Sequence, residues 1–290
     1  MSIKIIQSKL EQFQAQTPQE EQNALKEITQ EVALSGLSRA GFFKKASFQG
    51  GTCLRIFYGL ARFSEDLDFA LHTGDKAFDW MPYLQSLKTE LESYGYQIQV
   101  QDRSTPENAV KAGFLKDDSI GKILVLKQHS PMGMNKSNKP LKIKLEIDTN
   151  PPAGAVSEQK YTDFPVTVPV LVHDLPSLFA GKSHALLCRG WEKGRDWFDF
   201  NWYVGRKIEL NYELLSKALN QVGPWKGQGI LVTKRWYINN MRDKINSIQW
   251  EKQKQDISRF LKQRDLANLN LWSTEFFLNR LQSLEENLKG

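Results

Sequence analysis

The feature that most constrains the fold is a short run in which aspartates alternate with large apolar residues. In DLDFAL, Asp66 and Asp68 alternate with Leu67, Phe69 and Leu71. Strict alternation of this kind predicts a β-strand with one buried face. Successive strand side chains point to opposite faces, so the two carboxylates share a face about 7 Å apart. Because like charges repel and an unpaired buried charge is costly, the pattern predicts a positive group between them.

A pair of glycines lies shortly before this strand. The run ASFQG predicts a short strand that ends at Gly50 and Gly51, and TCLRIFYGL predicts an amphipathic helix after them. Backbone N–H groups at such a helix start can approach a phosphate closely, because glycine has no side chain. Two carboxylates on one strand face suit a hard cation such as Mg²⁺. Together with Thr52 and Ser64, these features predict a site for a nucleoside triphosphate bridged by metal.

The remaining periodicities predict an α+β domain with a mixed β-sheet, followed by an all-helical domain. Helices are expected over TPQEEQNALKEITQEVALSGL, which opens with a capping-box pattern, and over KAFDWMPYLQSLKTELESYG. Strands are expected at YQIQVQ, GKILVLKQ, LKIKLEID and FPVTVPVLV, with a loop at PMGMNKSNKP. From Leu175 the pattern is helical, and a final helix is expected to reach residue 288. The expected domains are residues 1–174 and 175–290.

The strand LKIKLEID carries two further acidic residues, Glu146 and Asp148, on one face. One interpretation is an exposed face with Lys–Glu pairs. The other is that one carboxylate completes a metal site with Asp66 and Asp68, since two metal ions about 3.5–4 Å apart need several shared oxygen ligands. Alternation determines the face but not the position along the strand, so Glu146 and Asp148 are both candidates.

The positive charge of the chain is concentrated in its last 110 residues. The net charge is +6; residues 1–180 hold 20 basic and 21 acidic residues, and residues 181–290 hold 19 and 12. This asymmetry favours a polyanionic partner, and the alternative is a solvated helical surface with surplus lysines. The candidate contacts are Lys226, Lys234, Arg235, Arg242 and Lys244, interleaved with Trp225, Trp236 and Tyr237, which could equally be core residues.

Nothing in the sequence predicts secretion or a membrane span. The N-terminal run MSIKIIQSKLEQFQ has no long apolar core or cleavage site, and no apolar stretch reaches the roughly 18 residues of a spanning helix. Two cysteines, Cys53 and Cys188, are too few for a disulfide framework. We therefore expect a cytoplasmic protein with reduced, structural thiols.

The residues around the aspartates resemble a known family. GGT followed by Y-x-x-x-R-x-S-E-D-L-D-F is similar to the first motif of the nucleotidyltransferase superfamily. More narrowly, it resembles the AbiEii/AbiGii-type toxins, whose members include tRNA-modifying nucleotidyltransferases. Gly51-Thr52 stands where the superfamily usually has Gly-Ser, so a hydroxyl is kept. The resemblance implies a nucleotidyltransferase-like N-terminal domain and two bound Mg²⁺ ions, or Mn²⁺, with Glu146 before Asp148 as the third carboxylate.

Two further family motifs resemble the segment AGKSHALLCRGWEKGRDWFDF. Gly181, Lys182 and Ala185 match G-K-x-x-A, and Arg195, Asp196 and Asp199 match R-D-x-x-D, whereas His173 stands in place of the family's threonine. Lys182 is a compact point charge suited to a triphosphate oxygen. By spacing alone Arg195 and Asp199 form an ordinary surface ion pair. The resemblance implies instead that the helical domain completes the active site, with Asp196 orienting Lys182 or the nucleotide and Arg195 with Asp199 bracing the helix.

The implied reaction is metal-dependent transfer of a nucleotide from an NTP to the 3′ hydroxyl of an RNA. The favoured acceptor is tRNA. The departing pyrophosphate would meet the Gly50 and Gly51 amides, Lys182 and Arg62. The implied setting is a toxin–antitoxin or phage-defence system with a cognate antitoxin.

Three alternatives to this reaction remain open. They are transfer of a nucleotide to a protein hydroxyl, protein or self phosphorylation with Ser64 as the obvious acceptor, and a non-catalytic nucleotide-binding module. The intact Asp66–Asp68 pair, together with Lys182 and Asp196, argues against the last.

Overall fold

The computed structural model describes residues 2–102, 119–128 and 141–289 of the chain. Two compact units are present. The first comprises Met1–Gly59, Phe63–Pro151 and Glu158–Val172, and the second Leu60–Arg62, Pro152–Ser157 and His173–Gly290. The expected boundary after residue 174 differs from this division at three short segments, 60–62, 152–157 and 173–174, which belong to the second unit.

A mixed β-sheet forms the centre of the first unit. Its strands are β1 (Ala46–Gln49), β2 (Asp66–Leu71), β3 (Tyr96–Asp102), β4 (Ser119–Gln128), β5 (Leu141–Asp148), β6 (Ser157–Tyr161) and β7 (Pro169–His173). The order across the sheet is β3-β4-β5-β2-β1-β7-β6. β2 runs parallel to β5 and β1 runs parallel to β7, whereas β1–β2, β4–β5 and β3–β4 are antiparallel. The expected α+β class with a mixed sheet is confirmed.

Two details of the strands differ from the expectation. β7 occupies only the last part of FPVTVPVLV, and β6 was not expected because SEQKY has no apolar alternation. The expected loop PMGMNKSNKP lies outside the described residues.

The helical elements of the first unit are α1 (Ser2–Gln12), α2 (Pro18–Arg39), η1 (Phe42–Lys44), α3 (Gly50–Tyr58) and α4 (Met81–Ser93). Thr17 caps α2 as expected, accepting a hydrogen bond from the backbone N–H of Glu20. α4 begins five residues later than expected, because Asp75 and Asp79 accept hydrogen bonds from the backbone N–H groups two residues ahead and form turns there.

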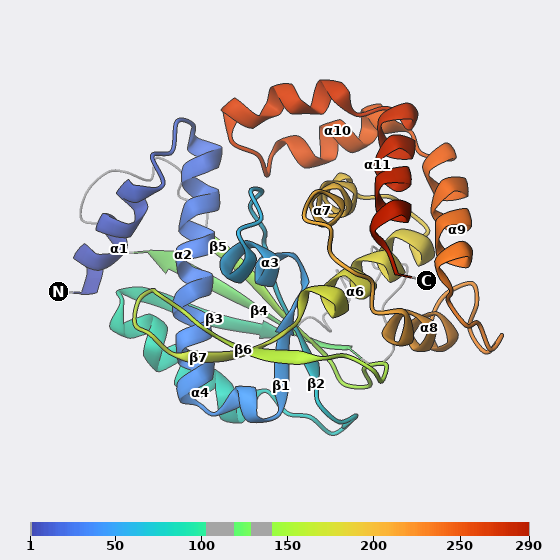
Figure 1. Ribbon diagram of the computed structural model, residues 1–290. Helices are drawn as coiled ribbons and strands as arrows, with labels where there is room; N and C mark the ends of the chain where they lie inside the picture. The colour runs from blue at the N-terminus through green and yellow to red at the C-terminus, as the bar shows by residue number, and fades with distance from the viewer. Residues whose placement is uncertain (1, 103–118, 129–140, 290) are drawn as a thin grey trace. The chain divides into compact units, whose positions relative to one another are not determined.

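The apolar side of the alternation in β2 is packed beneath helices. Figure 1 shows α2 and α4 covering one face of the sheet. Phe69 is 1% exposed, and its ring centroid lies 4.8 Å from that of Phe42 and 6.1 Å from that of Trp80. Since side chains alternate along a strand, burying Phe69 and Leu67 directs Asp66 and Asp68 to the opposite face.

The second unit is helical. Its elements are α6 (Leu175–Cys188), α7 (Gly194–Gly205), α8 (Tyr212–Gln221), α9 (Lys234–Asn246), α10 (Trp250–Ser258), η2 (Gln263–Leu271) and α11 (Thr274–Asn287), coloured yellow to red in Figure 1. α9 begins at Lys234, because the Thr233 side chain accepts a hydrogen bond from the backbone N–H of Trp236 and caps the helix there. The structure divides the expected final helix into three elements, α10, η2 and α11. An aromatic core of Trp197, Trp250 and Phe277 joins α7, α10 and α11.

Within the parts of the chain that the structure describes, no helix is both long and apolar enough to cross a membrane.

Candidate functional site

The parallel pairing of β2 with β5 places acidic residues side by side. Asp68 is in register with Glu146, and Asp66 with Lys144. Residues in register on adjacent strands point to the same face, so the carboxylates of Asp66, Asp68 and Glu146 share one face of the sheet. All three side chains are partly exposed.

Asp148 lies on the same face but at a different position. It is in register with Ala70 and only 6% exposed. Its Oδ1 accepts a hydrogen bond from the backbone N–H of Asn150 at 3.1 Å, which helps to shape the chain at the end of β5. The register therefore favours Glu146 over Asp148 as the partner of Asp68.

Gly50 is required by a close approach to Asp68. Its φ is +78°, and a Cβ atom added there would lie 2.4 Å from Oδ2 of Asp68. Gly50 is also the first residue of α3. The start of this helix, with the backbone N–H groups expected to bind phosphate, therefore lies against the Asp68 carboxylate.

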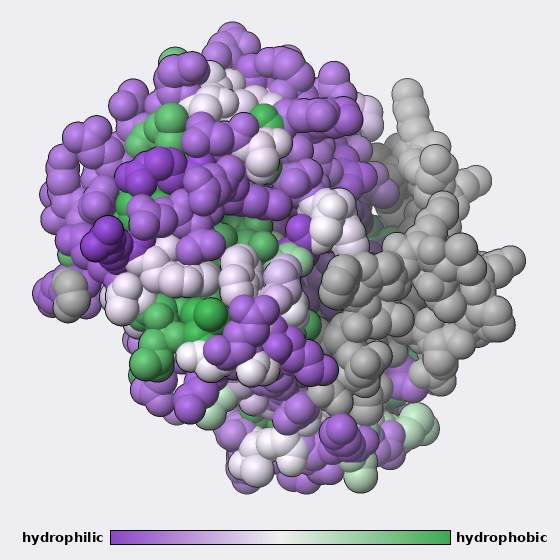
Figure 2. All heavy atoms as spheres, turned by 90° about the vertical axis from the view of Figure 1, so that its right-hand side faces the viewer, coloured by the Kyte–Doolittle hydropathy of each residue, from purple (hydrophilic) through white to green (hydrophobic). Residues whose placement is uncertain are grey.

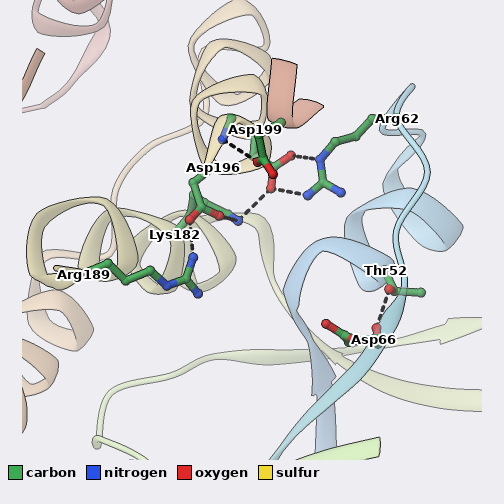
Figure 3. Close-up of polar contacts among 9 residues, drawn as sticks. Thr52, Arg62, Asp66, Lys182, Arg189, Asp196 and Asp199 are labelled. Carbon is green, nitrogen blue, oxygen red and sulfur yellow. Dashed lines mark hydrogen bonds and ion pairs between the residues drawn. The ribbon is translucent and has the colours of Figure 1, made fainter. Parts of the chain in front are cut away.

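Thr52 and Ser64 flank the same strand. The Thr52 side chain is fully buried, and its hydroxyl donates a hydrogen bond to the backbone carbonyl of Asp66 (Figure 3). This bond ties α3 to β2 and gives the hydroxyl a structural role. The carbonyl of Ser64 accepts a bond from the Gln30 side chain at 3.2 Å.

The carboxylate face has the donor chemistry of a magnesium site, since Mg²⁺ binds carboxylate oxygens. Among the described residues, however, no group of three or more His, Cys, Asp or Glu side chains is gathered into a ready metal cluster. The shared face and the register fit metal binding by Asp66, Asp68 and Glu146, and that binding stays a prediction.

A second cluster, made of Arg62, Lys182, Arg189, Asp196 and Asp199, lies in the helical unit. Lys182 Nζ lies 2.5 Å from Asp196 Oδ1 and 2.8 Å from Asp199 Oδ2 (Figure 3). Arg62 donates from Nε and Nη2 to the two oxygens of Asp199, each at 2.6 Å. Arg189 Nη1 pairs with the other oxygen of Asp196. We call these five residues the ion cluster.

The ion cluster is mostly buried, and each of its buried charges is stabilised by the opposite charges beside it. Burial works against the charge of Asp196, but Lys182 and Arg189 outweigh it and hold the pKa of Asp196 well below its usual range. Burial likewise opposes the charge of Arg62, yet attraction to Asp199 raises the pKa of the guanidinium. Removing one partner from such a set leaves an uncompensated buried charge, which is strongly destabilising.

Three residues of this region have partners that the sequence did not indicate. Arg62, expected at the pyrophosphate, is 2% exposed and directs its guanidinium to Asp199. Arg195, expected to brace the helix together with Asp199, lies with its guanidinium 4.5 Å from the ring centroid of Phe260. Arg189 was not among the expected site residues, although its spacing places it on the same helical face as Lys182.

The candidate nucleic-acid contacts separate into two groups. Lys234 donates to the backbone carbonyl of Leu288, Arg242 pairs with Glu285, and Lys244 pairs with Glu192. Lys226 and Arg235 are exposed and have no ionic partner among the residues that the structure describes. Trp225 and Trp236 contact each other edge to face at 5.4 Å, whereas Tyr237 is fully buried and hydrogen-bonded to Ser183. Tyr237 is therefore a core residue.

Comparison with known families decides the assignment. The sequence profile of the family described as "Nucleotidyl transferase AbiEii toxin, Type IV TA system" matches residues 32–280. The chain belongs to the AbiEii nucleotidyltransferase toxin family. It is accordingly a nucleotidyltransferase and the toxin of a type IV toxin–antitoxin system, which implies a cognate antitoxin.

Solved structures share the fold of this AbiEii toxin. JHP933 from Helicobacter pylori superposes with a TM-score of 0.52 at 16% identity, covering 92% of this chain and 93% of the other. MenT4, a nucleotidyltransferase toxin from Mycobacterium tuberculosis, gives a TM-score of 0.52 at 14% identity and covers 98% and 99%. At these identities the likeness establishes the fold alone. No curated protein matches the sequence significantly.

Replacing Gly50 with alanine tests whether the close approach to Asp68 matters for transfer. Gly227 is a matched control because its φ is +74° and an added Cβ would have nothing within 4 Å. Both substitutions carry a backbone cost of roughly 1–2 kcal/mol, but only Gly50→Ala displaces the Asp68 carboxylate. We expect Gly50→Ala to lower nucleotide transfer, assayed with radiolabelled NTPs, by about 10²-fold or more. Gly227→Ala should retain it, and equal activities in the two variants would contradict the assignment.

Proposed function

We propose that this toxin transfers a nucleotide from an NTP to the 3′ hydroxyl of an RNA, with tRNA as the first candidate acceptor. The observation that carries the proposal is the register of Asp68 beside Glu146, with Asp66 on the same face and the start of α3 against Asp68. Family membership supports the reaction type. Phosphoryl chemistry of this kind depends mainly on positioning and charge neutralisation.

Each group of residues has a proposed role. Asp66, Asp68 and Glu146 would hold Mg²⁺, or Mn²⁺, which supplies charge neutralisation at the phosphates and lowers the pKa of a bound hydroxyl. The backbone N–H groups of Gly50 and Gly51 bind phosphate oxygens. Lys182 contributes positive charge toward the triphosphate, and Asp196 and Asp199 hold its ammonium group in place.

The basic character of the helical unit supports an RNA acceptor. Residues 181–290 hold 19 basic and 12 acidic residues. Figure 2 shows a largely hydrophilic face with hydrophobic side chains in small groups. The exposed cations Lys226 and Arg235 adjoin, in sequence, the contacting tryptophans Trp225 and Trp236. Positive charge beside aromatic rings is typical of surfaces that bind unpaired nucleotides.

The decisive experiment for the function is incubation of the purified protein with total tRNA and each labelled NTP in Mg²⁺. We expect label to appear in tRNA. Asp68→Asn should reduce transfer by about 10³-fold or more, because a metal ligand is lost, while its thermal midpoint stays equal or rises as like-charge repulsion is relieved. Transfer is measured as label in tRNA after gel electrophoresis, and the midpoint is measured by thermal unfolding.

Two outcomes would contradict the proposal. Near-normal transfer by Asp68→Asn would show that Asp68 is not a required metal ligand. Label that appears only in added protein, or in the toxin itself, would replace RNA with a protein acceptor.

The RNA surface is tested by the salt dependence of binding. Binding to phosphates releases counterions, so log K falls linearly with log salt concentration, by about 0.7 per contact for single strands. Lys226→Ala/Arg235→Ala should reduce the magnitude of this slope by roughly one to two units. Arg242→Ala/Lys244→Ala is the matched control, because these cations already pair with carboxylates. Equal slopes in wild type and the first double variant would exclude this surface.

A further inference from the structure

The ion cluster contains one more cation than it has carboxylates. Arg62, Lys182 and Arg189 face Asp196 and Asp199. An excess charge in a mostly buried set is costly unless an anion compensates it. The cluster is therefore suited to receive a negatively charged group.

The three cations differ in how completely they are paired. The side chain of Arg62 is 2% exposed and bound through two nitrogens, and that of Lys182 is 13% exposed and contacts two carboxylates. Arg189 is 34% exposed and contacts Asp196 through Nη1. Its Nε and Nη2 have no hydrogen-bond partner in the part of the chain that the structure describes. The surplus charge is thus most accessible at Arg189.

The unpaired nitrogens of Arg189 lie on one edge of the guanidinium group. Arg62 uses the same Nε–Nη2 edge to bind both oxygens of Asp199. This edge matches two oxygens of a carboxylate or a phosphate equally well. In Figure 3 the Arg189 guanidinium is held at its other side by Asp196. Asp196 therefore orients Arg189 so that its Nε and Nη2 can donate two hydrogen bonds to one ligand.

We propose that Arg189 binds a phosphate group of the NTP through this edge. The proposal rests on the NTP substrate proposed above and gives that substrate a contact outside the expected motif residues. A triphosphate is favoured over a single RNA phosphate, because Lys182 lies in the same ion cluster and the net positive charge of that cluster suits a ligand with several negative charges. Asp196 acts as the positioning residue for Arg189.

The test compares Arg189→Ala and Arg189→Lys with Arg264→Ala. Arg264 is a matched control, since its side chain is 78% exposed and its neighbour Asp265 is 3.9 Å away. Inorganic triphosphate is titrated into each protein by calorimetry in the presence of EDTA, so that binding through a metal does not contribute. The KM for NTP and the affinity for tRNA are measured separately.

Arg189→Ala should weaken triphosphate binding and raise the NTP KM by about tenfold or more, as expected for loss of a bidentate charged contact. Its tRNA affinity should stay within about twofold of wild type, since the proposed contacts to the RNA backbone are Lys226 and Arg235. Arg189→Lys should recover only part of the triphosphate affinity, because an ammonium group lacks the planar edge. The lysine variant keeps a cation beside Asp196, so it reports on binding even if the alanine variant unfolds.

Unchanged triphosphate affinity in Arg189→Lys together with an unchanged NTP KM would overturn the proposal. A loss of tRNA affinity without a loss of triphosphate affinity would also overturn it and assign the contact to RNA. Failure of the acceptor assignment is distinguishable, because triphosphate binding is measured without any acceptor.

Discussion

The parallel pairing of β2 with β5 is the constraint on which the carboxylate face depends. It places Asp68 directly beside Glu146 and leaves Asp66 on the same face. Adjacent carboxylates repel, so this arrangement is stable only where water, donors or a cation offset the charge. On the other face Leu67, Phe69 and their neighbours are buried, and a slip by one residue would expose them. The apolar core thus keeps the acidic residues in register.

The electrostatics of the ion cluster differ from those of the carboxylate face. Here the carboxylates of Asp196 and Asp199 are buried, and each is compensated by two cations. Arg62 comes from a short segment that packs with the helical unit, although it precedes Asp66 by only four residues in sequence. A single substitution at Arg62 therefore acts first on the helical unit. The place of Arg62 in the same motif as the aspartates therefore does not by itself indicate a contact with substrate.

The sequence predicted the strands that carry the acidic residues and their common face, because alternation reports directly on which side chains are buried. It did not distinguish Glu146 from Asp148, since a period of two leaves the register between strands undetermined. The pairing of Glu146 with Asp68 and the hydrogen bond of Asp148 to Asn150 favour Glu146, and its role as a metal ligand stays a prediction.

Partners of charged side chains were less predictable than strands. Arg62 was expected to meet the departing pyrophosphate, but it binds the two carboxylate oxygens of Asp199, which is 137 residues away in sequence. Arg189 has no local signal beyond its helical spacing from Lys182. Tyr237 lies among cations in the sequence yet is buried in the fold, because its place on α9 faces Ser183.

The measurement that tests the proposed metal site most directly is Mn²⁺ binding by titration calorimetry. It compares the wild-type protein with Glu146→Gln and Asp148→Asn. Glu146 lies in register with Asp68, whereas the Asp148 carboxylate is bonded to the backbone at Asn150. Glu146→Gln should weaken Mn²⁺ binding by about tenfold or more, because a charged oxygen ligand is lost. Asp148→Asn should retain binding within about twofold of wild type. The opposite order, or no Mn²⁺ binding by the wild-type protein, would contradict the assignment of a metal site to this face.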